Sequence, residues 1–338
     1  MPAKDTFTMA AIQAAPVHFD KAASLEKACQ LIGQAGTKGV AIAAFGETWL
    51  PGYPLFAFGE HSPLFFQAHA EYIANAIEIP GPETDALAKA AKRAGIDVVI
   101  GVVEREPASQ GSVYCSLLFI GREGVVLGWH RKLMPTHRER IPWAQGDGAG
   151  LVVYERPYGR ISGLNCFEHF MMLPGYALAA QGTQIHVAAW PGREPPAPPP
   201  APMTLWPRQL LMSRAFAAQT GSYVILSAGV NRKSDMPERF HDLIKFEHSG
   251  DSCIIDPRGE VIAGPVEGED IVVAEGSLDL VRAAKASIDI AGHYARPDVL
   301  QLSVDRSRRP TVTATPAAIV PSPSDEPYGV EDSTGGQT

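Results

Sequence analysis

Three ionisable residues of different types each follow a short apolar run of the sequence. Glu47 follows GVAIAAF, Lys132 comes after GVVLGWH, and Cys166 comes after RISGL. Apolar runs of this length are typical of strands. In layered α/β proteins, functional groups collect just beyond the carboxyl ends of strands, so this common position predicts one shared site. Taken singly, each residue also fits a structural role, as a surface or capping carboxylate, a solvated charge or a buried thiol.

A carboxylate, an ammonium and a thiol together support one kind of chemistry. A cysteine nucleophile needs a base to take its proton, and a desolvated Glu47 carboxylate has the raised pKa that such a base requires. Attack on a carbon multiply bonded to nitrogen or oxygen builds negative charge, which the Lys132 ammonium and the backbone N–H after Cys166 can stabilise. The set therefore points to acyl transfer or nitrile hydrolysis, with no metal and no organic cofactor.

The surroundings of Cys166 predict a reactive thiol. An amphipathic segment over residues 170–180 has helical spacing, which places the cysteine at a strand-to-helix corner. Backbone N–H groups and a helix N-terminus at such a corner favour the thiolate. Glu168 and His169 are ionisable neighbours in otherwise apolar surroundings.

Composition limits the class of protein. The 338 residues are 45% hydrophobic and 20% charged, with a net charge of −8, which argues against a general nucleic-acid-binding surface. The four cysteines form no CxxC pair, and we interpret Cys29, Cys115 and Cys253 as core residues. We find neither a signal-peptide pattern nor an apolar run of membrane-spanning length, so we expect no membrane contact and a soluble, cytoplasmic protein.

Strand and helix patterns alternate over nearly 280 residues, with hairpins among them. Such a pattern predicts a layered α/β protein with mixed sheets. The predicted strands cover residues 7–14, 39–45, 96–103, 113–120, 125–131, 160–164, 184–189, 223–228, 252–256, 261–263 and 271–278. The predicted helices cover residues 21–35, 61–79, 84–94, 170–180, 205–220 and 280–286. We expect one domain over residues 1–305 and a flexible, polar, proline-rich tail over residues 306–338.

Three segments have the composition of long loops. Residues 48–60 are rich in proline, glycine and aromatic residues, and residues 130–150 are polar and irregular, which is typical of functional loops. The proline tract over residues 194–202 predicts an extended path. It is either a plain surface insertion or, because it follows Trp190, a wall of the entrance to the site.

Five segments in this order resemble the nitrilases of the carbon–nitrogen hydrolase superfamily, over roughly residues 7–305. They are FGETWLPGYP, HRKLMPTHRER, GLNCFEHF, QIHVAAWPG and GHYARPDVL. By this resemblance Glu47 is the general base, Lys132 stabilises charge and Cys166 is the nucleophile. Glu139 matches a second glutamate that the family places near the lysine, which implies a supporting role.

The resemblance also implies pocket residues and one departure. The family usually has tryptophan directly after the nucleophile, where this chain has Phe167. The backbone N–H survives that change but the indole does not, which affects substrate preference. Tyr53, Phe167, His169 and Trp190 are candidate substrate-binding residues, although aromatic residues in such loops more often serve packing. His130, His137 and His293 show no spacing of metal ligands.

The implied fold is a four-layer α-β-β-α sandwich, paired in a homodimer that assembles into larger spiral oligomers or filaments. The implied reaction converts a nitrile and water to a carboxylic acid and ammonia through a covalent thioimidate and thioester. An amidase or carbamoylase, or cyanide hydrolysis, uses the same three residues. A catalytically silent scaffold subunit is the alternative of a different class, and retention of the whole trio argues against it.

Overall fold

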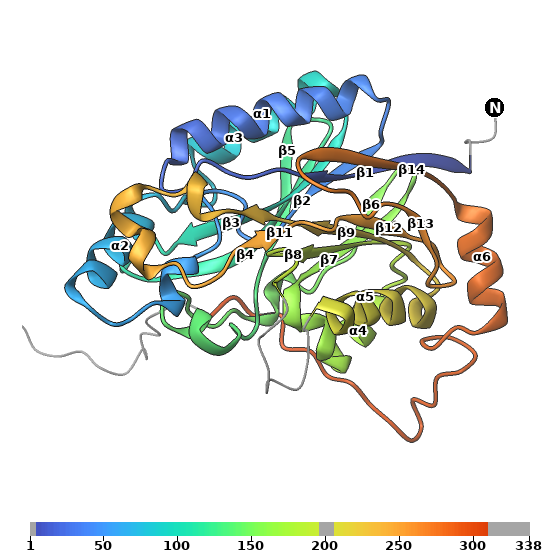
Figure 1. The fold of residues 1–338 in the computed structure, drawn as a ribbon. Helices are drawn as coiled ribbons and strands as arrows, with labels where there is room; N and C mark the ends of the chain where they lie inside the picture. The colour runs from blue at the N-terminus through green and yellow to red at the C-terminus, as the bar shows by residue number, and fades with distance from the viewer. Residues whose placement is uncertain (1–4, 196–205, 310–338) are drawn as a thin grey trace, which may run out of the picture. The chain divides into compact units, whose positions relative to one another are not determined.

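Two six-stranded sheets form the centre of the protein in this computed structural model, which describes residues 5–195 and 206–309 (Figure 1). The first sheet has the order β14 (Asp270–Ser277), β1 (Thr6–Gln13), β2 (Ile42–Phe45), β3 (Asp97–Arg105), β4 (Val113–Gly121), β5 (Val125–Arg131). The second has the order β13 (Val261–Ala263), β12 (Cys253–Ile255), β9 (Tyr223–Ala228), β8 (Ile185–Trp190), β7 (Gly159–Asn165), β6 (Tyr154–Arg156). Strands β10 (Val230–Asn231) and β11 (His248–Ser249) pair separately.

Helices cover the outer face of each sheet. Helices α1 (Lys21–Thr37) and α3 (Pro82–Ala94) pack on the first sheet, and α4 (Met172–Ala179) and α5 (Trp206–Thr220) lie on the second (Figure 1). Helix α2 (Pro63–Ala74) packs beside the 3₁₀ turns η1 (Leu55–Phe58) and η6 (Glu238–Leu243), and α6 (Leu278–Ser287) follows β14. The predicted four-layer α-β-β-α sandwich is confirmed.

The alternation of side chains along the strands explains the layers. On β8, Ile185, Val187 and Ala189 enter the core between the two sheets. Ala188 and Trp190 point the other way, into the core beneath α5. Both faces of the strand are therefore buried, which is why its sequence is mostly apolar, with His186 as its one polar side chain.

Within each sheet, the strands that carry the candidate site residues end on the same side. β1, β2 and β3 are parallel, as are β7, β8 and β9. β5 is antiparallel to β4, and β4 is antiparallel to β3, so β5 runs in the direction of β3. The carboxyl ends of β2, β5 and β7 carry the three residues that the sequence singled out.

The elements differ from the predicted ones mainly at their ends. The hairpin of β4 and β5 and that of β12 and β13 form as predicted. The helix predicted over residues 61–79 ends at Ala74, because Ile77 pairs with Glu104 of β3 and the chain there must be extended. β6, β10 and β11 were missed, and each has only two or three residues.

The boundary of the domain near residue 305 stays a prediction. The described chain up to Arg308 forms one compact unit, but most of the tail predicted over residues 306–338 lies outside the described residues. The same holds for most of the proline tract. Within residues 5–195 and 206–309, none of the helices combines the length and apolar character needed to cross a membrane.

Candidate active site

Glu47 stands two residues beyond the end of β2, at a point where the two sheets nearly touch. A Cβ on the preceding Gly46 would lie 2.8 Å from the backbone nitrogen of Gly229, which explains the glycine there. The backbone N–H of Glu47 donates to the carbonyl of Trp190, at 3.1 Å. The Glu47 side chain is buried. The first sheet thus supplies a carboxylate whose backbone is anchored to the second sheet.

Lys132 follows β5 and joins two carboxylates. Its Nζ lies 2.7 Å from Oε1 of Glu47 and 2.7 Å from Oε2 of Glu139. Burial alone would lower the pKa of Lys132, but the negative charges of Glu139 and Glu47 raise that pKa well above its usual value. The ammonium therefore keeps its proton throughout the physiological range of pH.

Glu139 lies in the 3₁₀ turn η2 (His137–Arg140) and has each oxygen bound. Its Oε1 accepts from the hydroxyl of Tyr53 at 2.7 Å. Its Oε2 accepts from the backbone N–H of Thr136 as well as from Lys132, so turn and lysine are held together. The geometry gives Glu139 the position next to Lys132 that the sequence predicted.

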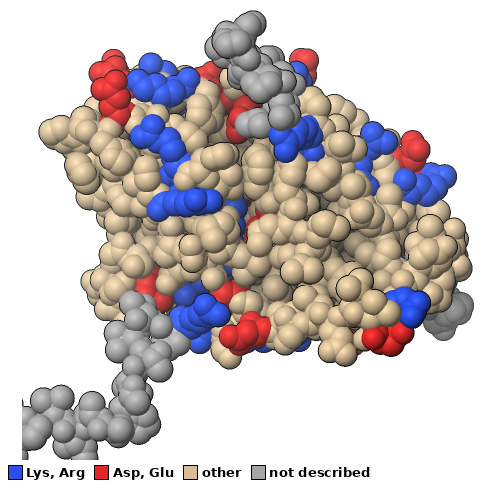
Figure 2. Space-filling model, turned by 90° about the horizontal axis from the view of Figure 1, so that it is seen from below, with Lys and Arg blue, Asp and Glu red and all other residues tan. Residues whose placement is uncertain are grey.

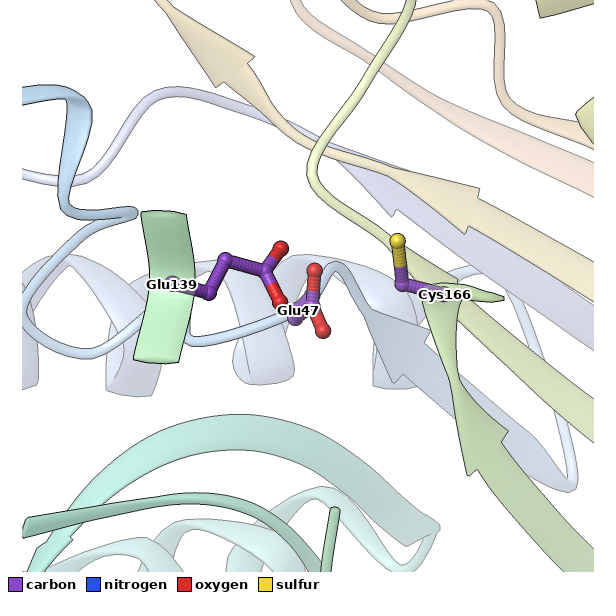
Figure 3. A group of neighbouring side chains, drawn as sticks. All are labelled: Glu47, Glu139 and Cys166. Atoms are coloured by element: carbon purple, nitrogen blue, oxygen red, sulfur yellow. The ribbon is translucent and has the colours of Figure 1, made fainter. Parts of the chain in front are cut away.

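Cys166 follows β7 and begins the 3₁₀ helix η4 (Cys166–Phe170), with a φ of 49°. Positive φ is uncommon for a residue with a side chain, so Cys166 stands at a sharp turn of the backbone. Glu47, Glu139 and Cys166 have ligand atoms within 4.8 Å of one another. In the view of Figure 3, the carboxylate of Glu47 lies between Glu139 and the sulfur.

The backbone N–H at the corner favours the thiolate as predicted, but it does not determine the net pKa of Cys166. Burial raises the pKa of Cys166 well above its usual value, and the charge of Glu47 raises it further. Lys132 and the backbone N–H of Phe167 lower that pKa, but they do not outweigh burial. The corner leads into a short 3₁₀ turn rather than an α-helix, so the helix N-terminus assumed from the sequence is not at the sulfur.

Glu47 has the complementary property. Burial raises its pKa, Lys132 lowers it and Glu139 raises it, which leaves a value of about 7. A carboxylate with this pKa can take a proton near neutral pH and return it. Its Oε2 is buried and has no hydrogen-bond partner among the described residues. The site therefore contains a protonated thiol beside a base with one free oxygen.

The same atoms have the spacing of a small metal site. However, the ammonium of Lys132 already bonds to the carboxylates of Glu47 and Glu139. The Lys132 ammonium already neutralises the charge of the two carboxylates, as a bound metal ion would do. These residues are therefore suited to proton transfer and charge stabilisation without a metal.

Cys115 also belongs to the site, although the sequence suggested a plain core residue. Its Sγ lies 3.4 Å from Oε1 of Glu47. The signal for this contact was available in the predicted hairpin. Ser116 pairs with Arg131, which puts Cys115 beside Lys132, and the Lys132 N–H donates to the Cys115 carbonyl at 2.8 Å.

Glu168 holds the strands that carry the site rather than the sulfur itself. Its carboxylate lies 3.0 Å from Nε2 of His130 and accepts from the backbone N–H groups of Leu133 and Asn165, at 2.9 and 2.8 Å. Burial alone would raise the pKa of Glu168, but His130 and these N–H donors lower it. One buried carboxylate thus ties the end of β5 to the end of β7.

The four predicted pocket residues fall into two groups. Tyr53 lies on the Glu139 side, with His248 against its ring at 5.1 Å. Phe167, His169 and Trp190 lie together on the Cys166 side, where Trp190 contacts Phe167 at 6.0 Å and His169 at 5.3 Å between ring centroids.

A cavity of about 770 Å³ lies on the far side of His248 from Tyr53, and its described lining includes neither the three catalytic candidates nor the four predicted pocket residues. Its wall includes His248, whose ring contacts Tyr53, and Phe246, whose ring contacts Phe58. The remaining lining residues are Arg193, Glu194, Pro195, Val230, Arg232, Lys233, Ile244, Lys245, Glu247, Ser249 and Gly268. A cavity of this size accommodates a small organic molecule.

Comparisons with known proteins agree with this geometry. The model of the family described as "Carbon-nitrogen hydrolase" matches residues 8–286. "Nitrilase 2" of an unknown prokaryotic organism is 53% identical over 307 residues, covering 90% of this chain and 94% of that protein. The "Aliphatic nitrilase" of Sinorhizobium fredii (strain HH103) is 35% identical over 317 residues, covering 90% of this chain and 98% of that protein.

Solved structures support the fold. The NitFhit protein of C. elegans superposes with a TM-score of 0.71 at 18% identity, over 91% of this chain and 69% of that one. A carbon–nitrogen hydrolase from Helicobacter pylori G27 gives 0.69 at 17% identity, over 87% and 96%. The family model and the two sequence relatives confirm the predicted family, and the chain belongs to the carbon–nitrogen hydrolase family, in its nitrilase branch.

Proposed function

We propose that this protein hydrolyses a nitrile to the carboxylic acid and ammonia through a cysteine-bound intermediate. The observation that carries the proposal is the convergence of the Cys166 thiol, the free oxygen of Glu47 and the Lys132 ammonium in one buried site. The identity of 53% to a protein named a nitrilase supports the nitrile as substrate.

In the first half of the reaction, Oε2 of Glu47 takes the thiol proton while Sγ of Cys166 bonds to the nitrile carbon. The nitrile nitrogen receives the proton, and the triple bond becomes the double bond of a thioimidate. The N–H of Phe167 and the Lys132 ammonium stabilise the negative charge that develops on nitrogen.

In the second half, Glu47 removes a proton from water as its oxygen adds to the thioimidate carbon, and that proton goes to nitrogen. Ammonia leaves and a thioester remains. A second water, activated in the same way, breaks the carbon–sulfur bond, so the acid leaves and Cys166 recovers its proton. Two waters are consumed for each nitrile. Glu139 holds Lys132 and Tyr53 in place, in a supporting role.

An ammonia assay on aliphatic, arylacetic and aromatic nitriles, cyanide and the matching amides tests this proposal. We expect ammonia from at least one class of nitrile and none after Cys166→Ala. Release from amides alone would indicate an amidase or carbamoylase, and release from cyanide alone would indicate cyanide hydrolysis. Undiminished release by the Cys166→Ala protein would overturn the covalent mechanism, and no release by the wild type would favour a silent scaffold subunit.

We also propose that residues 194–202 shape the entrance to the site. Glu194 and Pro195 line the cavity of about 770 Å³, and the tract continues from there outside the described residues. Shortening residues 196–202 should change which nitriles are hydrolysed. An unchanged profile across the nitrile panel would contradict this role.

We propose that the protein works as a homodimer or larger spiral assembly in the cytoplasm, with the domain ending near residue 305. Exposed apolar side chains on one face support the assembly: Met171, Met172, Leu173 and Leu211. That face, seen from below in Figure 2, carries scattered charges of both signs around a mostly neutral surface. The four free cysteines suit a reducing compartment.

A further inference from the structure

The carbonyl group of the nucleophile is the end of a buried chain of hydrogen bonds. Nδ1 of His169 lies 2.7 Å from the backbone oxygen of Cys166. Nε2 of His169 lies 3.1 Å from Nε2 of His186, and Nδ1 of His186 lies 2.8 Å from the Ser162 hydroxyl. That hydroxyl lies 2.6 Å from the hydroxyl of Thr183. Five groups from β7, η4, β8 and the turn before β8 are thus connected.

The chemistry of each group gives the chain one direction. A carbonyl only accepts, so Nδ1 of His169 carries a proton. Burial lowers the pKa of His169 to about 4, so its Nε2 carries none near neutral pH and must accept from Nε2–H of His186. Burial also lowers the pKa of His186 well below its usual value, which leaves its Nδ1 as an acceptor.

The two hydroxyls complete the direction. Ser162 has a single proton, which it donates to Nδ1 of His186, so the proton between the two hydroxyls belongs to Thr183. Every donor in the chain therefore points toward the Cys166 carbonyl. Aromatic rings fix the two imidazoles: His186 stacks on Phe216 with centroids 3.9 Å apart, and His169 stacks on Trp190 at 5.3 Å.

The carbonyl at the end of this chain shares a peptide unit with a donor that the mechanism uses. The oxygen of Cys166 and the N–H of Phe167 lie on opposite sides of one planar peptide group. A hydrogen bond that fixes the oxygen therefore also fixes the direction of the N–H. Because Cys166 has a φ of 49°, its peptide needs such support to stay in place.

We propose that His169 and His186 are positioning residues, which hold the Cys166–Phe167 peptide so that the Phe167 N–H points at the reacting atom. This inference rests on the proposed function, because it assigns that N–H to charge stabilisation. Neither imidazole needs to exchange a proton with the substrate. The charged and titratable groups that act on the pair are Glu168, Lys132 and His130.

The decisive variant is His186→Phe, which keeps a flat ring against Phe216 and removes the N–H donor to His169. A displacement of about 1 Å at the reacting groups costs on the order of a hundredfold in rate, so we expect kcat to fall ten- to a hundredfold. KM should stay within twofold, because the buried His186 ring contacts Ser162, His169 and Phe216 rather than the substrate. His186→Gln restores an N–H donor at about the same distance and should recover most of kcat.

If His186→Phe does not fold, two alanine variants that remove less of the buried structure provide the same test. Ser162→Ala removes the donor to Nδ1 of His186, and we expect kcat to fall at least threefold. Ser222→Ala is the matched control, because Ser222 is an equally buried serine that bonds to Thr220, outside the chain. It should leave kcat unchanged, while both alanine variants lose similar thermal stability.

The assay uses whichever nitrile or amide the wild-type protein hydrolyses, so failure of the proposed function is seen in the wild type alone. Given an active wild type, a kcat within twofold for folded His186→Phe would overturn the inference. Equal losses for His186→Gln and His186→Phe would also overturn it, because packing rather than the N–H donor would then matter. Equal losses for Ser162→Ala and Ser222→Ala would have the same consequence.

Discussion

At the scale of single residues, the two oxygens of Glu47 have different surroundings. Oε1 receives the Lys132 ammonium at 2.7 Å and the Cys115 thiol at 3.4 Å. Oε2 is buried with no partner in the described chain. One oxygen is thus held while the other can accept the proton of the nucleophile, and this division suggests two experiments.

The first experiment is the pH dependence of the reaction. The base works only as a carboxylate, and burial raises the pKa of Glu47 to about 7. We therefore expect kcat/KM to rise with pH through about 7 and to fall roughly tenfold per pH unit well below it. An initial-rate series on a nitrile measures this, and a rate unchanged down to pH 5 would contradict the assignment of Glu47.

The second experiment concerns Cys115. Its hydrogen bond lowers the pKa of Glu47, so Cys115→Ala should move the acidic limb of the kcat/KM profile to higher pH. Cys115→Ser keeps a donor and should leave the limb close to the wild-type position. KM should change little in either variant. If the acidic limb of the kcat/KM profile does not move in the Cys115→Ala protein, the Cys115 thiol does not influence the pKa of Glu47.

The sequence predicted these residues unevenly. Strand ends brought Glu47, Lys132 and Cys166 together as expected, because β2 and β5 of the first sheet and β7 of the second end at the same site. The effect of burial on the pKa of Cys166 was missed, because desolvation is a property of the packed site and leaves no local pattern in the sequence. The contact of Cys115 was encoded in the register of a hairpin that the sequence did predict.

At the scale of elements, the critical contact is the one between the sheets at Gly46. An alanine there would bring Cβ to 2.8 Å from the Gly229 nitrogen and 2.9 Å from the Trp190 carbonyl oxygen. Both are backbone atoms, so the sheets would have to move apart. We expect Gly46→Ala to lower kcat about a hundredfold, because the base would shift by a fraction of an ångström or more.

Gly33→Ala is the matched control. Gly33 lies inside α1, and a Cβ there would meet nothing within 4 Å. This change should raise the free energy of unfolding by about 0.5–1 kcal/mol, because alanine loses less backbone entropy than glycine in a helix. Urea unfolding and kcat measure the two effects. If Gly46→Ala keeps full activity, the spacing of the sheets does not limit catalysis.

Elements were easier to predict than their ends. Buried strands such as β8 are covered on both faces, and a mostly apolar run identifies them well. The 3₁₀ helix after Cys166 was missed because its five residues carry too few periodic positions to distinguish it from the start of α4. The pair of β10 and β11 forms between residues far apart in the sequence, and the periodicity of a single segment cannot predict such a pairing.

At the scale of the whole molecule, the neutral face over α4 and α5 bears on assembly. Met172 and Leu173 are 83% and 65% exposed. Groups of exposed apolar side chains are rare on the surface of monomeric proteins and often mark an interface. We expect the double variant Met172→Glu, Leu173→Glu to give a smaller particle in light scattering. The melting temperature of the separated subunit should stay close to the wild-type value, because neither side chain is buried.

The control for that experiment is Lys89→Glu, an exposed position on α3 in the opposite outer layer. It should leave the particle size unchanged. If the double variant keeps the wild-type size, then the subunits associate through another surface, of which the exposed segment around Tyr294, Val299 and Leu300 is the next to test.

The carbonyl of Trp190 accepts N–H groups from both Glu47 and Gly229, and so it joins the two sheets beside the site. The thiol of Cys166 comes from the second sheet, and its base comes from the first. A molecule in which only one sheet has formed therefore has a thiol without its base, and such a thiol keeps its proton near neutral pH. Transfer of the thiol proton to Glu47 therefore requires that the two sheets have docked, and a partly folded chain cannot carry out the reaction by this route.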